Sequence, residues 1–133
     1  MAELVFFYGT LMTPFNRTAQ LRIDHDLVFR GRGTIAAALF DLGIYPAAVP
    51  APDSRVCGEV YEMTNRERVL HALDEIEGYR PGDPATSLYI RDLVPVAMAE
   101  GTRVQAWAYF YNAPLGRAER IESGDYLEHL KVR

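Results

Sequence analysis

The feature that most constrains the fold of this chain is an apolar run near its start that stops at a glycine. Gly9 follows Val5-Phe6-Phe7-Tyr8, and mostly small or polar residues come after it. A short apolar run that ends at glycine predicts a buried strand leading into a tight turn. Backbone N–H groups just beyond such a strand lose their ladder partners, so they either find a partner in the protein or bind an anion. The sequence leaves both possibilities open: a simple turn after an edge strand, or an anion-binding loop.

Strand patterns dominate the remainder of the chain. Segments typical of strands lie at residues 4–8, 56–61, 88–96 and 104–111, and residues 27–42 predict one or two bent strands. Prolines between residues 46 and 52 predict irregular chain, and short helices are expected from Thr13 and at residues 126–131. Because helices do not alternate regularly with these strands, the pattern favours an α+β fold or a small β-barrel over a doubly wound sheet. At this length, residues 1–133 most simply form a single domain.

One principal helix is expected between the strands. Thr64 and Glu67 have the spacing of a capping box with Thr64 as N-cap. Gly78 lies where a helix often ends in a left-handed residue, and Pro81 follows it. These signals predict a helix from Asn65 to about Glu77.

The helical wheel places an acid in the apolar face of this helix. The buried arc is predicted to hold Val69, Leu70, Leu73 and Ile76. Glu77 falls inside that arc, whereas Asp74 lies at its edge and Glu75 outside it, so only Glu77 lacks an easy role in solvent. Partial burial at the negative end of the helix dipole would raise the pKa of Glu77 toward the range of a general base. The alternative is that the helix frays earlier and Glu77 simply reaches water.

Composition excludes several classes of protein. The 14 basic and 18 acidic side chains give a formal net charge of −4, which argues against nucleic-acid binding. No apolar run is long enough to span a bilayer, and the start of the chain lacks the basic segment of a signal peptide. The single cysteine, Cys57, can form no internal disulfide. These features together predict a cytoplasmic protein with no membrane or nucleic-acid partner.

Three rival sites carry less weight. Gly31-Arg32-Gly33-Thr34-Ile35-Ala36 has the spacing of a dinucleotide loop, with Asp53 downstream, but no βαβ unit surrounds it. The three histidines, at positions 25, 71 and 129, show no ligand spacing, so no metal site is expected, and His71 should face solvent. Cys57 lies within an expected strand, which favours a buried structural thiol over a nucleophile.

Five motifs occur in an order and spacing that resemble the gamma-glutamylcyclotransferase-like family. They are Tyr8-Gly9-Thr10-Leu11, Gly43-Ile44-Tyr45-Pro46, Val56-Cys57-Gly58-Glu59-Val60-Tyr61, Leu73-Asp74-Glu75-Ile76-Glu77-Gly78-Tyr79 and Leu88-Tyr89-Ile90-Arg91. A late Ile121-Glu122-Ser123-Gly124-Asp125-Tyr126 also resembles the ending of that family. The resemblance runs from about Leu4 to Tyr126. It implies a small barrel of mixed strands, one principal helix beside it, and a pocket at the mouth of the barrel.

The resemblance also implies a reaction. The α-amino group of a gamma-glutamyl amide attacks its own γ-carbonyl, which closes a lactam and releases 5-oxoproline with a free amine or amino acid. No cofactor is expected for this acyl transfer with C–N cleavage, because the nucleophile is tethered to the electrophile. The expected partner is therefore a small gamma-glutamyl substrate, and the identity of the leaving amine and the oligomeric state stay open. The alternative is a non-catalytic module that binds a metabolite or peptide in the same pocket.

Site residues follow from the same resemblance. Glu77 corresponds to the catalytic glutamate that moves the proton from the α-ammonium to the leaving amine. The backbone of Tyr8, Gly9, Thr10 and Leu11 corresponds to the loop that cradles the substrate. Tyr89 corresponds to a tyrosine near the pocket. Two further tyrosines, Tyr109 and Tyr111, are candidates for its lining, and residues 80–87 are candidates for its leaving-group side.

Overall fold

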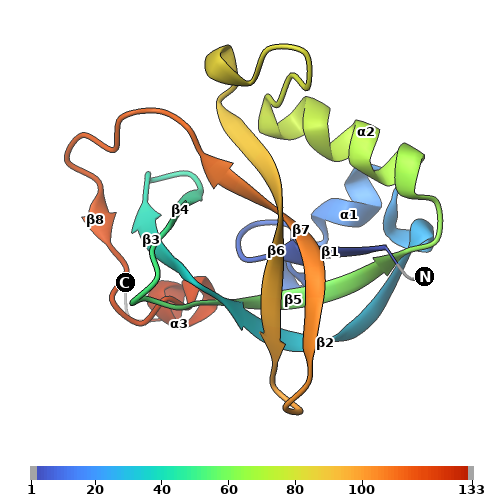
Figure 1. Cartoon of the computed structure of the whole chain (residues 1–133), viewed down its shortest axis with the longest axis horizontal. Helices are drawn as coiled ribbons and strands as arrows, with labels where there is room; N and C mark the ends of the chain where they lie inside the picture. Colours follow the sequence, from blue (N-terminus) through green and yellow to red (C-terminus); the bar gives the residue numbers. More distant parts are fainter. Residues whose placement is uncertain (1–2, 132–133) are drawn as a thin grey trace.

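The computed structural model describes residues 3–131 and centres on a closed β-barrel (Figure 1). The strands follow the order β1 (Leu4–Phe7), β5 (Val56–Met63), β2 (Leu27–Ile35), β6 (Tyr89–Met98) and β7 (Arg103–Tyr111). Neighbours pair antiparallel except β1 and β7, which run parallel and close the barrel at Val5 and Trp107. The expectation of an α+β fold with a small mixed-strand β-barrel and one principal helix is confirmed.

The barrel interior depends on one glycine of β5. Val56 and Val60 are fully buried on the same face as Gly58, because alternate residues of a strand point to the same side of the sheet. A Cβ at Gly58 would lie 2.3 Å from the carbonyl oxygen of Phe7 and 2.6 Å from the ring of Phe6. Since real side chains never approach so closely, the absence of a side chain here lets β1 and the Phe6 ring pack against β5.

A second, three-stranded sheet lies beside the barrel. Its order is β4 (Pro46–Pro50), β3 (Ala37–Asp41) and β8 (Glu119–Arg120). The predicted bent strands over 27–42 are thus β2 and β3. The expectation of irregular chain at the prolines is confirmed at Pro52, which lies in a turn, but was wrong for residues 46–50. Pro46 and Pro50 occupy the two ends of β4, an edge strand, where a missing backbone N–H costs little.

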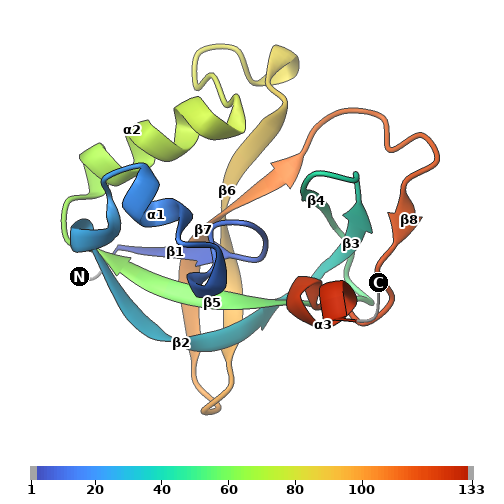
Figure 2. The same cartoon turned by 180° about the vertical axis from the view of Figure 1, so that it is seen from behind.

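The principal helix α2 spans Arg66–Glu77 and ends where the sequence predicted. Gly78 follows it with φ of 66° and caps it in the left-handed conformation. The N-cap prediction was wrong, because Asn65 replaces Thr64 in that role. The Asn65 side chain accepts a hydrogen bond from the backbone N–H of Arg68 at 3.2 Å, as an N-cap asparagine does. Figures 1 and 2 show α2 and the small sheet on either side of the β6–β7 pair.

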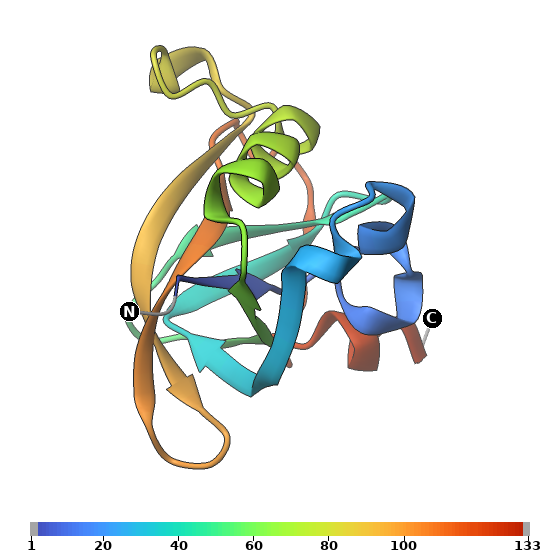
Figure 3. The same ribbon diagram turned by 90° about the vertical axis from the view of Figure 1, so that its right-hand side faces the viewer.

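The remaining helical segments are short. They are η1 (Thr13–Phe15), α1 (Arg17–Gln20), η2 (Asp24–Asp26), η3 (Pro84–Thr86) and α3 (Tyr126–Lys131). The single helix expected from Thr13 is interrupted at Asn16, whose φ is 54°. Thr13 does not cap it by its side chain; its amide and hydroxyl donate to the buried Glu59 carboxylate at 2.8 and 3.1 Å. Figure 3 shows the η1–α1 region beneath α2. Over residues 3–131, none of these helices has the length and apolarity needed to cross a membrane.

The dinucleotide-loop alternative is excluded by the register of β2. Gly31 to Ile35 lie within this strand and pair with β5 along the barrel wall, after a register shift between Phe29 and Gly31. A phosphate-binding loop must leave its strand and open a helix, and this segment does neither.

Candidate active site

A cavity of about 280 Å³ opens where the end of β1, the end of α2 and the start of β6 meet. It is lined by residues 6–11, Arg17, residues 44–46, Ile76, Glu77, Leu88, Tyr89 and Tyr109. The structure therefore brings together Glu77, Tyr89 and the Tyr8–Leu11 loop, although these segments lie far apart in the sequence. Of the two further tyrosines, Tyr109 lines the cavity, whereas Tyr111 is not among its lining residues and packs edge-on against Tyr89 at 5.3 Å between ring centroids.

The loop after β1 forms one wall of the cavity. Its turn is closed by a 3.1 Å hydrogen bond from the Met12 amide to the Gly9 carbonyl. The amides of Gly9, Thr10 and Leu11 donate to no acceptor among residues 3–131. Gly9 itself is required by packing, because a Cβ there would lie 2.8 Å from the Pro46 ring. The loop thus lines the cavity and has three amide donors without an acceptor in the described chain, and such donors can bind anions and oxyanions.

Glu77 contributes a carboxyl group to the cavity lining. It is the last residue of α2, so the alternative of an earlier frayed end is wrong. Its carboxylate accepts no hydrogen bond and forms no ion pair with the described residues 3–131. Burial raises the pKa of Glu77 to about 7, and the guanidinium of Arg17 opposes that shift. A carboxyl group poised near neutral pH and free of partners can accept and return a proton.

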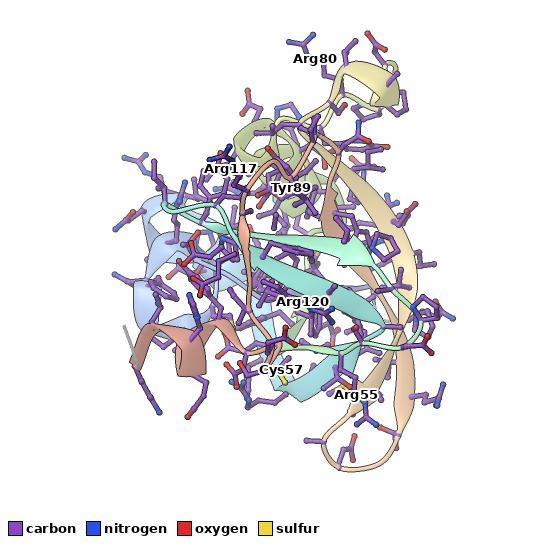
Figure 4. All side chains as sticks on the ribbon, turned by 90° about the vertical axis from the view of Figure 1, so that its left-hand side faces the viewer. Arg55, Cys57, Arg80, Tyr89, Arg117 and Arg120 are labelled. Atoms are coloured by element: carbon purple, nitrogen blue, oxygen red, sulfur yellow. The ribbon has the colours of Figure 1, made fainter. Side chains whose placement is uncertain are left out.

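Two tyrosine hydroxyls of the site bind protein carbonyls. Tyr8 donates to the backbone oxygen of Tyr109 at 2.5 Å, and Tyr89 donates to that of Pro46 at 3.0 Å. Burial, with the nearby Glu77 charge, raises the pKa of both phenols well above the ordinary value, so both stay neutral. Figure 4 shows Tyr89 in the interior, whereas Arg80 projects at the end of the 80–87 loop. The two hydroxyls therefore fasten the cavity walls and leave the aromatic rings as lining.

Comparison with known proteins agrees with this geometry. Residues 5–128 match the family model described as gamma-glutamyl cyclotransferase, AIG2-like. The chain belongs to this family. A protein of Methanocaldococcus jannaschii, whose name assigns it provisionally as a gamma-glutamylcyclotransferase, is 30% identical over 96% of this chain and 98% of its own.

Solved structures of relatives share the fold. YkqA from Bacillus subtilis superposes with a TM-score of 0.73 at 26% identity, covering 99% of this chain but 42% of YkqA. An AIG2-like protein from mouse superposes with a TM-score of 0.65 at 27% identity, covering 85% of this chain and 80% of the mouse protein. This member of the gamma-glutamylcyclotransferase family thus spans less than half the length of YkqA.

An ion-pair network that the sequence did not predict holds the site of this family member together. Asp74, expected to have a solvent role, binds the Arg91 guanidinium through both carboxylate oxygens at 3.0 and 3.2 Å and accepts the Tyr109 hydroxyl at 2.6 Å. The Arg91 guanidinium also stacks on the Trp107 ring at 4.7 Å. The helical wheel placed Asp74 at the edge of the buried arc, but its partners lie on β6 and β7 and only the fold brings them near.

Arg17 is a charged residue of the cavity lining that the sequence analysis missed. It stands at the start of α1, half-buried, and its Nη1 donates to the Thr10 hydroxyl at 3.4 Å. Among residues 3–131 it is the only cationic side chain that lines the cavity. No motif marks it, because its approach to Thr10 depends on how the η1–α1 segment folds back over the loop after β1.

The structure also places Cys57, two of the histidines and the 80–87 loop. Cys57 is half-buried and not fully buried, and His71 is exposed as expected. The 80–87 loop does not line the cavity; only Leu88, just after it, does. The His129 Nε2 atom lies 2.8 Å from Asp41 Oδ2. Together with Glu119, these two residues form a group of possible metal ligands whose ligand atoms lie within 4.8 Å of one another. The scattered histidine positions gave no sign of that group.

Proposed function

We propose that this chain is a cofactor-free gamma-glutamylcyclotransferase that converts a gamma-glutamyl amide into 5-oxoproline and a free amine or amino acid. One observation carries the proposal: an unpartnered carboxylate with a pKa of about 7 shares a cavity with a loop whose backbone donors are free. A site that only bound the substrate carboxylate would gain nothing from a second buried negative charge at Glu77. The pairing of an acid–base group with oxyanion donors instead suits an acyl transfer.

Glu77 acts first as the base. An α-amino group with a pKa of about 8 is mostly protonated at neutral pH and cannot attack. Transfer of one proton to the Glu77 carboxylate frees the nitrogen lone pair, which forms a bond to the γ-carbonyl carbon. The π electrons move to the carbonyl oxygen. The amides of Gly9, Thr10 and Leu11 are the donors available for this oxyanion and for the substrate α-carboxylate.

Glu77 then acts as the acid. The proton returns from its carboxyl group to the leaving nitrogen, the oxyanion electrons re-form the carbonyl, and the C–N bond to the amine breaks. The regenerated Glu77 carboxylate removes the second proton from the new ring nitrogen, and this proton leaves with the amine as an ammonium group. Proton and charge balance without a further reactant, so the products are 5-oxoproline and the amine. Because attack is intramolecular, a substrate held in the right orientation in the cavity avoids much of the entropy cost that a separate nucleophile would add to the barrier.

The test is release of 5-oxoproline from a panel of gamma-glutamyl amines and amino acids. Glu77→Gln is nearly isosteric but cannot accept a proton, so turnover should fall by about 10²- to 10⁴-fold. Glu75→Gln, on the exposed face of the same helix, removes the same charge and should keep full activity. Equal turnover by the wild type and Glu77→Gln would contradict the mechanism. A wild type that is stabilised by 5-oxoproline in thermal unfolding but releases none from any substrate would instead be a binding module.

A further inference from the structure

The cavity lining includes a cation, Arg17, without a counter-ion among the described residues. Arg17 forms no ion pair with any carboxylate of residues 3–131, and its single hydrogen bond there is the long one to Thr10. Glu77 lies near enough for the guanidinium to lower the pKa of its carboxyl group, but no salt bridge joins them. A half-buried guanidinium with most of its five donors unused is well suited to bind a carboxylate through two parallel hydrogen bonds.

The surroundings of Arg17 indicate which part of a substrate it meets. The glutamyl half already has the free amides of the loop after β1 and the Glu77 carboxylate. Arg17 stands outside the barrel on α1, as Figures 2 and 3 show for that element. Two apolar side chains of the lining, Ile44 and Leu88, are 84% and 40% exposed. Large apolar groups exposed at the edge of a cavity favour an apolar portion of the ligand there.

We propose that Arg17 is a specificity-determining residue that binds a carboxylate on the leaving group, so that this chain prefers substrates whose released amine carries both a carboxylate and an apolar side chain. This inference rests on the proposed function, because it assigns the glutamyl half of the substrate to the loop and Glu77. Ile44 and Leu88 would contact the apolar side chain of the leaving group. Amines of the same shape without the carboxylate would leave Arg17 unpaired and bind less well.

A matched pair of substrates isolates the carboxylate. Gamma-glutamyl-leucine and gamma-glutamyl-isoamylamine differ only by that group on the leaving amine. We expect the wild type to use the leucine compound with a kcat/KM about 10- to 100-fold higher, as for a charge-assisted hydrogen bond. Arg17→Met should abolish this ratio by lowering kcat/KM for the leucine compound far more than for the isoamylamine compound. Arg103→Met, which removes an exposed arginine on β7, should keep the ratio of the wild type.

The ratio cancels any effect that the two substrates share. Loss of Arg17 also raises the pKa of Glu77, which slows both reactions equally at neutral pH. Equal losses for both compounds, or no preference in the wild type, would overturn the role of Arg17 while leaving the reaction intact. Calorimetric binding of the two compounds to Glu77→Gln, with and without Arg17→Met, tests the carboxylate site separately from the proposed reaction. An Arg17-dependent preference in binding, with no turnover by the wild type, would support the carboxylate site and overturn the proposed reaction.

Discussion

At the scale of single residues, Glu77 combines three properties that rarely coincide. It ends a helix, it lies in the apolar arc of that helix, and its carboxylate accepts no hydrogen bond from the described residues. Burial therefore keeps its proton until about pH 7. A side chain held in this way is suited to proton transfer and, for the same reason, costs stability when it ionises.

The pH dependence of stability follows from the raised pKa of Glu77. Below pH 4.5 the carboxyl group is protonated in both the folded and the unfolded chain. Between pH 4.5 and about 7 the unfolded chain loses the proton first, so the free energy of unfolding falls as pH rises, by up to about 3 kcal/mol. The free energy of unfolding of Glu77→Gln should therefore match that of the wild type at pH 4 and exceed it at pH 8. Urea unfolding of both proteins measures the difference, and a difference independent of pH would refute it.

At the scale of elements, α2 is tied to the barrel by charge as well as by packing. Val69 and Leu73 are fully buried beneath it, and Asp74 binds Arg91 of β6 and the hydroxyl of Tyr109 of β7. These contacts come one turn before Glu77. Because the Asp74 and Arg91 side chains are both largely buried, at 14% and 13% exposed, the pair is shielded from the solvent screening that weakens surface ion pairs.

Asp74→Asn tests this connection. The change keeps the shape but removes the charge and leaves Arg91 without its carboxylate, so we expect a loss of about 2 to 3 kcal/mol in the free energy of unfolding. Turnover should also fall, since the end of α2 that carries Glu77 is no longer held against β6 and β7. Glu75→Gln, one position along but exposed, should change stability by less than about 0.5 kcal/mol. Similar unfolding curves for the two variants would show that packing alone fixes the helix.

At the scale of the whole molecule, the segment before α3 returns to the barrel at Gly124. The Gly124 carbonyl accepts the amide of Cys57 in β5 at 2.7 Å. Nearby, the Ile121 amide donates to Leu39 of the small sheet at 2.8 Å, and the Ile121 side chain is buried. The segment before α3 therefore joins the barrel to the three-stranded sheet.

Gly124→Ala should be far more damaging than its small volume suggests. Gly124 has φ of 68°, and a Cβ there would lie 1.9 Å from the Arg55 carbonyl oxygen. Gly116 has a similar φ of 59° but open space around it, so Gly116→Ala isolates the backbone strain at about 1 kcal/mol. We expect Gly124→Ala to lose at least about 3 kcal/mol, because the clash adds to that strain. If thermal or urea unfolding shows the same loss of stability for Gly124→Ala and Gly116→Ala, the segment can move away from β5.

The sequence by itself determined what depends on neighbours along the chain. The end of α2 at Glu77, its left-handed cap at Gly78 and the inward face of β5 follow from spacing within a dozen residues, and the structure agrees with all three. Because the five motifs also lie in the order of a known family, the barrel could be predicted together with Glu77, Tyr89 and the loop after β1 as parts of the cavity lining. Even locally, competition between adjacent caps was not resolved, since Asn65 and Thr64 are both good N-cap residues.

Tertiary structure alone decided the contacts between distant segments. β4 became a strand despite its prolines because β3 supplies the pairing partner on one side only. Asp74 became part of a buried network because Arg91 and Tyr109 approach it from two strands. Arg17 entered the cavity because α1 folds over the loop after β1. Each of these depends on a spatial neighbour far away in the chain. The period of a strand or helix predicts which face is buried but not which distant residue packs against it.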